Sequence, residues 1–169
     1  MLLRLGFVTN SSSTTHIMMW KGDKGKLREL LEAHASHFNL TYEGYGQDEP
    51  YRATSDEVAS AILSCLDKTT DAKEYAAGQR ADAERNQKYV EEENARRPHG
   101  GDWFQGYVRA AEDRARRADE FDHVLQVGFG DNHGDFEGGD LGMTMDYEGR
   151  FIRIVDADGG FYYTTEQNR

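Results

Sequence analysis

The first twenty residues change twice between apolar and polar patterns. Apolar residues recur at every second position over 3–7, and an unbroken apolar run covers 17–20, with a hydroxyl-rich stretch at 10–15 between them. Alternation with a period of two beside a turn-forming stretch is typical of a β-hairpin. We therefore expect a hairpin over residues 1–20, with its turn at 10–15 and with Ile17 facing the core.

Helical spacing replaces this alternation in the middle of the chain. Apolar residues recur every three or four positions over about 25–38 and again over about 54–68. In the second stretch Thr54 and Glu57 have the spacing of a capping box, which marks the start of a helix. These two stretches predict amphipathic helices that cover one face of a sheet.

The pattern then predicts a helical hairpin that is poor in large apolar side chains. A third helix runs from Asp71 to about Ala95, a Pro-Gly turn ends it, and Asp102 caps a fourth helix. Alanine occupies most apolar positions of both helices, so the segment buries little area. We expect an αα-hairpin over 71–120 that projects from the sheet or packs at its edge.

Strand-like runs return after residue 121. They cover 124–129, 141–147, 150–155 and 161–165, and Gly-containing turns such as Asp158-Gly159 separate the later ones. This pattern predicts an antiparallel meander. The fold class is therefore α+β: an antiparallel sheet built from the N-terminal hairpin and the C-terminal meander, with a central helical segment that includes the αα-hairpin. We expect one domain over 1–169, with 71–120 as an excursion.

Composition narrows the function without identifying it. The net charge is -11, so non-specific binding to nucleic acid is disfavoured because it depends on Lys and Arg at the phosphates. No apolar run is long enough for a transmembrane helix, which argues against a membrane location. Cys65 is the single cysteine, so no intramolecular disulfide forms, and a reducing compartment such as the cytoplasm is expected.

The hydroxyl-rich stretch carries a family resemblance. Residues 6–15 read GFVTNSSSTT, which resembles the N-terminal G-F-V-[S/T]-N-S-S-S signature of small phage and bacterial proteins without an established activity. The resemblance implies the cytoplasm of a bacterial host cell, or a virion. From the residues alone the stretch is a turn. The alternative is an anion site in which side chains and turn amides hold a phosphate, formed by Asn10, Ser11, Ser12 and Ser13.

A second candidate site lies in the Gly-rich acidic loop after residue 130. Side chains that can bind a metal occupy every second position of this loop, so they share one face if the chain is extended. They are Asp131, His133, Asp135 and Glu137. Carboxylates with an imidazole suit a divalent metal such as Mn, Zn or Mg. A flexible acidic hairpin loop is the alternative, and we expect no other cofactor.

Part of this loop is similar to the first metal motif, D-x-H-G, of calcineurin-like metallophosphoesterases. The resemblance implies Asp131 and His133 as metal ligands. That family continues with G-D-x-x-D-R-G and G-N-H-[E/D] motifs, and neither occurs in the 36 residues after His133. We therefore interpret the match as coincidental.

Two function hypotheses follow. The first is a non-enzymatic phage or bacterial interaction protein, a virion or host-modulating component, that binds a protein partner or a second copy through its acidic surface or its helical hairpin. The alternative is a metal-dependent hydrolase of a phosphate ester that uses the 131–137 loop. The common catalytic motifs do not occur in the sequence. The enzyme question therefore depends on the 131–137 loop alone.

Overall fold

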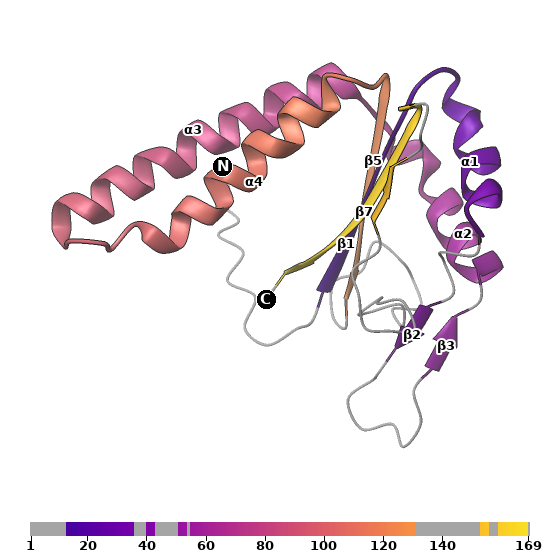
Figure 1. Ribbon diagram of the computed structural model, residues 1–169, viewed down its shortest axis with the longest axis horizontal. Coiled ribbons are helices and arrows are strands. Elements are labelled where there is room, and N and C mark those ends of the chain that lie inside the picture. Colours follow the sequence, from indigo (N-terminus) through magenta and orange to yellow (C-terminus); the bar gives the residue numbers. More distant parts are fainter. Residues whose placement is uncertain are drawn as a thin grey trace. The chain divides into compact units, whose positions relative to one another are not determined.

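The computed structural model describes residues 13–35, 40–42, 51–53, 55–130, 153–155 and 159–168. The fold is α+β, as expected (Figure 1). Its elements in chain order are β1 (Ser13–Trp20), α1 (Leu27–Ala33), β2 (Leu40–Tyr42), β3 (Tyr51–Ala53), α2 (Ser55–Ser64), β4 (Thr70–Asp71), α3 (Ala72–Arg96), α4 (Asp102–Ala118), β5 (His123–Gly130), β6 (Arg153–Val155) and β7 (Phe161–Asn168). Short 3-10 helices cover Lys24–Lys26 and Leu66–Lys68.

The chain divides into two compact units. The first comprises 1–18, 23–69 and 125–169, and the second comprises 19–22 and 70–124. The larger unit holds most of the strands with α1 and α2, and the smaller one holds α3 and α4. Whether the chain is one domain stays a prediction.

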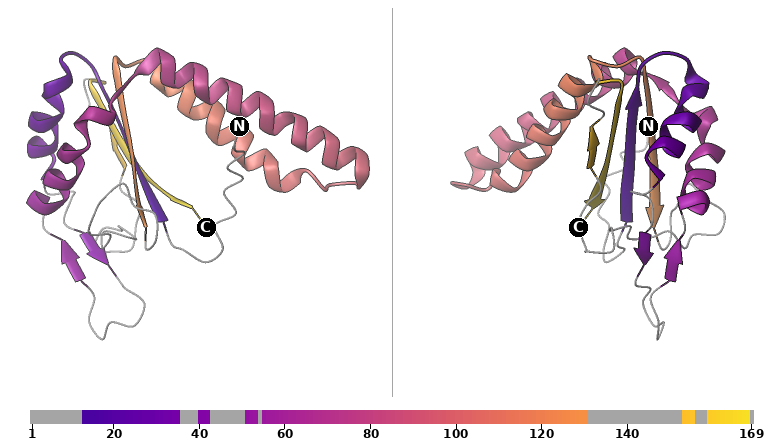
Figure 2. Two further views of the ribbon diagram at one scale, coloured as in Figure 1. Left: turned by 180° about the vertical axis from the view of Figure 1, so that it is seen from behind. Right: turned by 45° about the vertical axis from the view of Figure 1, so that its right-hand side comes forward.

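The main sheet has five strands in the order β4-β5-β1-β7-β6, and β2 pairs with β3 in a separate two-stranded sheet. The two ends of the chain therefore share one sheet, as the sequence pattern indicates. β6 and β7 pair antiparallel with Ile154 opposite Tyr163, and β1 runs opposite to β5 (Figure 2). Among the described strands β1 lies between β5 and β7, so β5 does not pair directly with the later C-terminal strands. The predicted strand over 141–147 lies outside the described residues.

The position of the predicted first turn also needs correction. Ser13, Thr14 and Thr15 belong to β1 and not to a turn. Threonine fits a pleated strand well, so sheet pairing outweighs the local turn preference of these hydroxyl residues. The first strand of the expected hairpin lies outside the described residues.

The core of the larger unit is built around β1. His16, Ile17 and Met18 are all at most 1% exposed, so both faces of the strand are covered there. This explains the unbroken apolar run, because alternation is lost when both faces are buried. Helices α1 and α2 lie on one face of the sheet (Figure 1). His34, at the end of α1, stacks on Phe161 of β7 with ring centroids 5.5 Å apart.

The helices differ in detail from the predicted ones. α1 ends at Ala33, before the predicted end at 38, and α2 ends at Ser64, after which a 3-10 turn follows. α3 begins where the sequence pattern predicts. Asp71 caps it, because its Oδ1 accepts hydrogen bonds from the backbone N–H of Lys73 and of Glu74.

The cap predicted at Asp102 is wrong. Asp102 is the first residue of α4, and Gly101 before it provides no side chain. Asn94 of α3 lies beside this helix start, and its Oδ1 accepts a hydrogen bond of 2.9 Å from the N–H of Gly101 itself.

Candidate interaction surface on the helical hairpin

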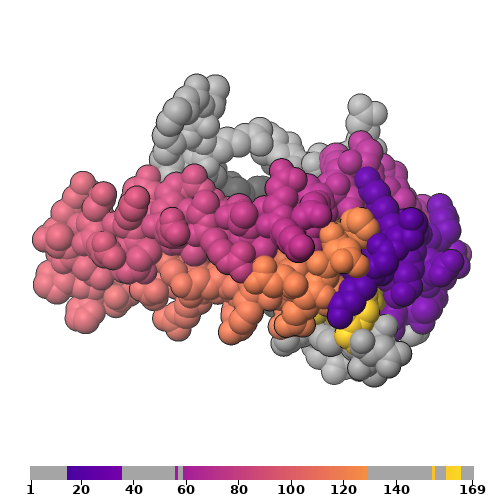
Figure 3. Space-filling model, turned by 90° about the horizontal axis from the view of Figure 1, so that it is seen from above, coloured from indigo at the N-terminus to yellow at the C-terminus, as the bar shows by residue number. Residues whose placement is uncertain are grey.

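Helices α3 and α4 pack antiparallel along a narrow seam of small side chains. Figure 3 shows the two helices side by side along the hairpin. The seam is built from Ala83, Val90, Val108 and Ala111, with Phe104 packed against it. Alanine keeps the helix axes close but buries little apolar area, and burial supplies about 25 cal/mol per Å². The hairpin therefore forms as predicted, on a thin core.

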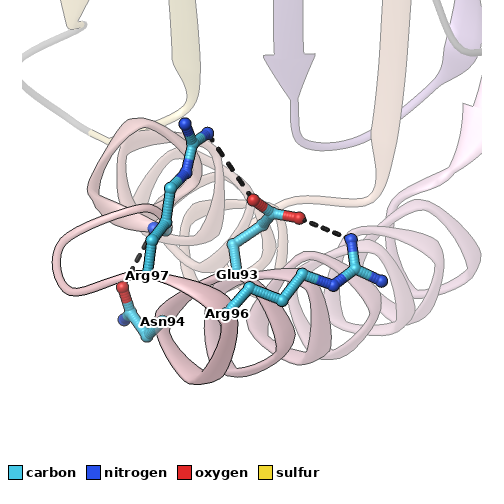
Figure 4. Close-up of polar contacts among 5 residues, drawn as sticks. Glu93, Asn94, Arg96 and Arg97 are labelled. Carbon is cyan, nitrogen blue, oxygen red and sulfur yellow. Dashed lines mark hydrogen bonds and ion pairs between the residues drawn. The ribbon is translucent and has the colours of Figure 1, made fainter.

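The turn between the helices is tightly constructed. A Cβ at Gly101 would lie 2.5 Å from the carbonyl oxygen of Val90, so the two chain segments touch there. Glu93 accepts from Arg96 at 2.9 Å and also faces Arg97 at 3.6 Å (Figure 4). The Glu93 contacts lie within the last turn of α3, whereas the close approach of Gly101 to Val90 joins the start of α4 to α3.

The base of the hairpin is tied by Asp122. Its carboxylate accepts from the Gly22 N–H at 2.8 Å, its own N–H donates to the Trp20 carbonyl at 3.1 Å, and its carbonyl accepts from the Ala72 N–H at 3.0 Å. The chain thus enters α3 and leaves α4 at one point. Thr70 and Val124 also pair there, as neighbours in β4 and β5.

The surface of the hairpin carries exposed aromatic rings. Among the residues that the structure describes, three large hydrophobic side chains are exposed: Tyr89 at 36%, Trp103 at 68% and Tyr107 at 49%. All three lie on the hairpin. Trp103 and Tyr107 are one helical turn apart with ring centroids separated by 6.1 Å, and Tyr89 stacks on Phe104 at 6.0 Å. We refer to these four residues as the aromatic patch.

The charge of the hairpin differs from that of the rest of the chain. Residues 72–118 contain ten Lys or Arg and nine Asp or Glu, whereas the whole chain contains 20 and 31. The hairpin therefore carries about +1, and the remaining residues carry -12. Pairs within one helix such as Arg85–Asp82 and Arg116–Asp113 are exposed. Exposed pairs of this kind contribute little to stability, so this part of the surface is a mixed, solvated one.

The core of the larger unit contains one buried polar pair that the sequence did not predict. His16 of β1 is fully buried, and its Nδ1 lies 2.6 Å from the hydroxyl oxygen of Tyr163 on β7. Burial lowers the pKa of His16 to about 3 and raises the pKa of Tyr163, so both groups are neutral near pH 7. A neutral, fully buried pair fits a structural role in the core.

Of the residues in the two sites predicted from the sequence, the structure describes Ser13 alone. Asn10, Ser11 and Ser12 lie outside the described residues, and Ser13 is the first residue of β1. The whole metal-type group also lies outside them, namely Asp131, His133, Asp135 and Glu137. Over the described ranges no cluster of three or more His, Cys, Asp or Glu could hold a metal ion. Both sites therefore stay predictions.

Sequence reasoning missed two residues of the aromatic patch. It identified the hairpin but not Trp103 and Tyr107. A signal was present, because these two residues stand one position before Phe104 and Val108 of the seam. Large aromatics immediately beside an alanine-rich stripe are placed at the rim of the seam and not inside it.

None of the helices in the described ranges is long and apolar enough to span a membrane. No protein-family model matches the chain, and neither a curated protein nor a solved structure shows significant similarity to it.

Proposed function

We propose that this chain is a non-enzymatic interaction protein that binds a protein partner through the aromatic patch of its helical hairpin. The observation that carries the proposal is the gathering of the exposed large hydrophobic side chains on this one segment. Trp, Tyr and Arg dominate the binding energy of protein interfaces, and all three are present on α4.

The build of the hairpin supports this role. The hydrogen bond from the Gly101 N–H to Asn94 and the close approach of Gly101 to Val90 hold the start of α4 against α3, so the patch needs little ordering when a partner binds. The patch also avoids the strong negative charge of the rest of the chain, which would repel most acidic proteins. The acidic surface keeps the chain soluble and away from nucleic acid.

The setting follows from the N-terminal signature. Its resemblance to small phage and bacterial proteins supports action inside a bacterial host cell or as part of a virion. In either setting a small acidic protein whose helical hairpin exposes an aromatic patch would serve as an adaptor or as a modulator of a host protein.

Site-specific photocross-linking tests the proposal. A photoreactive phenylalanine analogue at position 103 should give discrete adducts in host cells that express the full chain. The matched control carries the same residue at position 109, because Arg109 is exposed on another face of the same helix. Equal adduct patterns from both positions, or none from 103, would contradict a binding role for the patch.

A further inference from the structure

The surface of α4 contains a second stripe beside the one that packs on α3. The seam side consists of Phe104, Val108, Ala111, Ala115 and Ala118. One position earlier, the same alternating spacing of four and three gives Trp103, Tyr107, Ala110, Arg114 and Arg117. This spacing keeps residues on one face along a pair of packed helices. We call the second set the outer stripe.

The outer stripe is nearly symmetric about its centre and complementary in chemistry: Trp103 and Arg117 lie seven positions from Ala110, Tyr107 lies three positions before it and Arg114 lies four after it. Ala110 stands at its centre, with two aromatic residues before it and two arginines after it. If two such helices cross antiparallel at Ala110, Trp103 of one copy meets Arg117 of the other, and Tyr107 meets Arg114. A guanidinium over an aromatic face is attracted by the ring, and more so when water is excluded.

We infer that the partner of the aromatic patch is a second copy of this chain, held by a two-fold pairing of the outer stripes. The inference rests on the proposed function, since it names the occupant of the same surface. A two-fold contact uses the same patch on both copies and therefore requires a self-complementary surface. The antiparallel order of aromatic and cationic ends meets that requirement, whereas a parallel order would bring Arg114 against its own copy.

The centre of the stripe and the net charge also favour this arrangement. Alanine at position 110 lets the two helix backbones approach closely at the crossing. Two copies that each carry -11 repel one another, but the hairpin itself carries about +1. Contact through the hairpins is therefore the arrangement that brings the least like charge together.

The side chain of Arg114 reaches from α4 to α3. It donates to the Gln79 side chain across the two helices at 3.4 Å. Arg114 and Arg117 are partly buried, whereas Arg116 between them is exposed. The two arginines of the outer stripe thus differ from Arg116 in burial, and Arg116 can serve as a control.

Sedimentation velocity of the full chain over a wide concentration range tests the inference. We expect a monomer–dimer equilibrium whose dissociation constant rises at least about tenfold in Trp103→Ala and in Arg117→Glu, and is unchanged in Arg116→Glu. A monomer at every concentration would overturn the inference, and so would equal dimerisation in all four proteins.

A disulfide trap gives a second readout that does not depend on affinity. Ala110→Cys places a thiol on the two-fold axis, where it meets its own copy, and should cross-link under mild oxidation. Arg109→Cys is the matched control, and the native Cys65 is buried in both proteins. Equal cross-linking of the two variants would contradict the two-fold crossing. Photoadducts from position 103 to a different protein, with a monomeric chain, would overturn self-pairing and leave the proposed function standing.

Discussion

Burial determines the roles of individual polar residues in this chain. His16 follows the hydroxyl stretch, where a catalytic partner would be looked for, but β1 places it in the core against Tyr163. A buried polar group is tolerated only when it is hydrogen-bonded, and this pair satisfies that condition. The sequence could not predict the pair, because 147 positions separate its members.

The buried pair should make stability dependent on pH. In the folded chain the pKa of His16 is lowered from 6.5 to about 3, so the unfolded chain binds more protons between these values. Stability is therefore present above about pH 6.5 and falls as pH decreases, by at most about 1.4 kcal/mol per pH unit from this group.

The double variant His16→Phe/Tyr163→Phe should lack this component, since it removes the buried imidazole that titrates. Urea unfolding at about pH 7 and pH 5 measures the difference for both proteins. If wild type and variant lose the same stability on acidification, His16 does not titrate as its burial requires.

A second residue-scale prediction concerns two glycines of the hairpin. Gly101→Ala should destabilise the hairpin by about 1–3 kcal/mol, because the new Cβ would press on the backbone of Val90. Gly78→Ala is the control. Nothing lies within 4 Å of a Cβ there, so alanine should stabilise α3 by about 0.5–1 kcal/mol. Thermal unfolding of both variants checks the signs, and a neutral Gly101→Ala would show that the turn is not closely packed.

At the scale of elements, local signals were predictable and distant pairings were not. The cap at Asp71, the alanine-rich spacing and the Pro-Gly turn lie within or beside the helices that they specify, so the αα-hairpin was predictable. The place of β1 between β5 and β7 depends on contacts across the whole chain, and the apolar run of β1 does not specify its neighbours. Trp103 and Tyr107 were missed because their spacing is that of a second stripe, one position before the seam residues Phe104 and Val108.

The hairpin should be dispensable for the fold of the larger unit. Its two ends meet at one point, where the Ala72 N–H donates to the Asp122 carbonyl at 3.0 Å, so a short Gly-Ser linker can replace residues 73–120. We expect the shortened chain to keep a cooperative thermal transition, because the seam of the hairpin is made of small side chains. Loss of all cooperative unfolding would instead make the hairpin part of the main core. Circular dichroism at increasing temperature measures both outcomes.

At the scale of the whole molecule, charge and apolar surface are separated along the chain. Most of the net negative charge lies outside residues 72–118, and the exposed aromatic rings of the described residues lie within them. Composition alone gave the net charge but not this separation, which depends on which aromatics the fold buries. Trp20 and Trp103 show the contrast, because the first is fully buried and the second is 68% exposed.

The emission of Trp103 gives the most direct test that a second copy of this chain covers the aromatic patch. The Trp20→Phe variant keeps Trp103 as its single tryptophan and is held at a low, fixed concentration. The tryptophan-free variant Trp20→Phe/Trp103→Phe is then added at increasing concentration. The account predicts a saturable blue shift and a loss of acrylamide quenching as the second chain covers the indole. Red-shifted emission that stays fully quenchable up to the highest soluble concentration would contradict it.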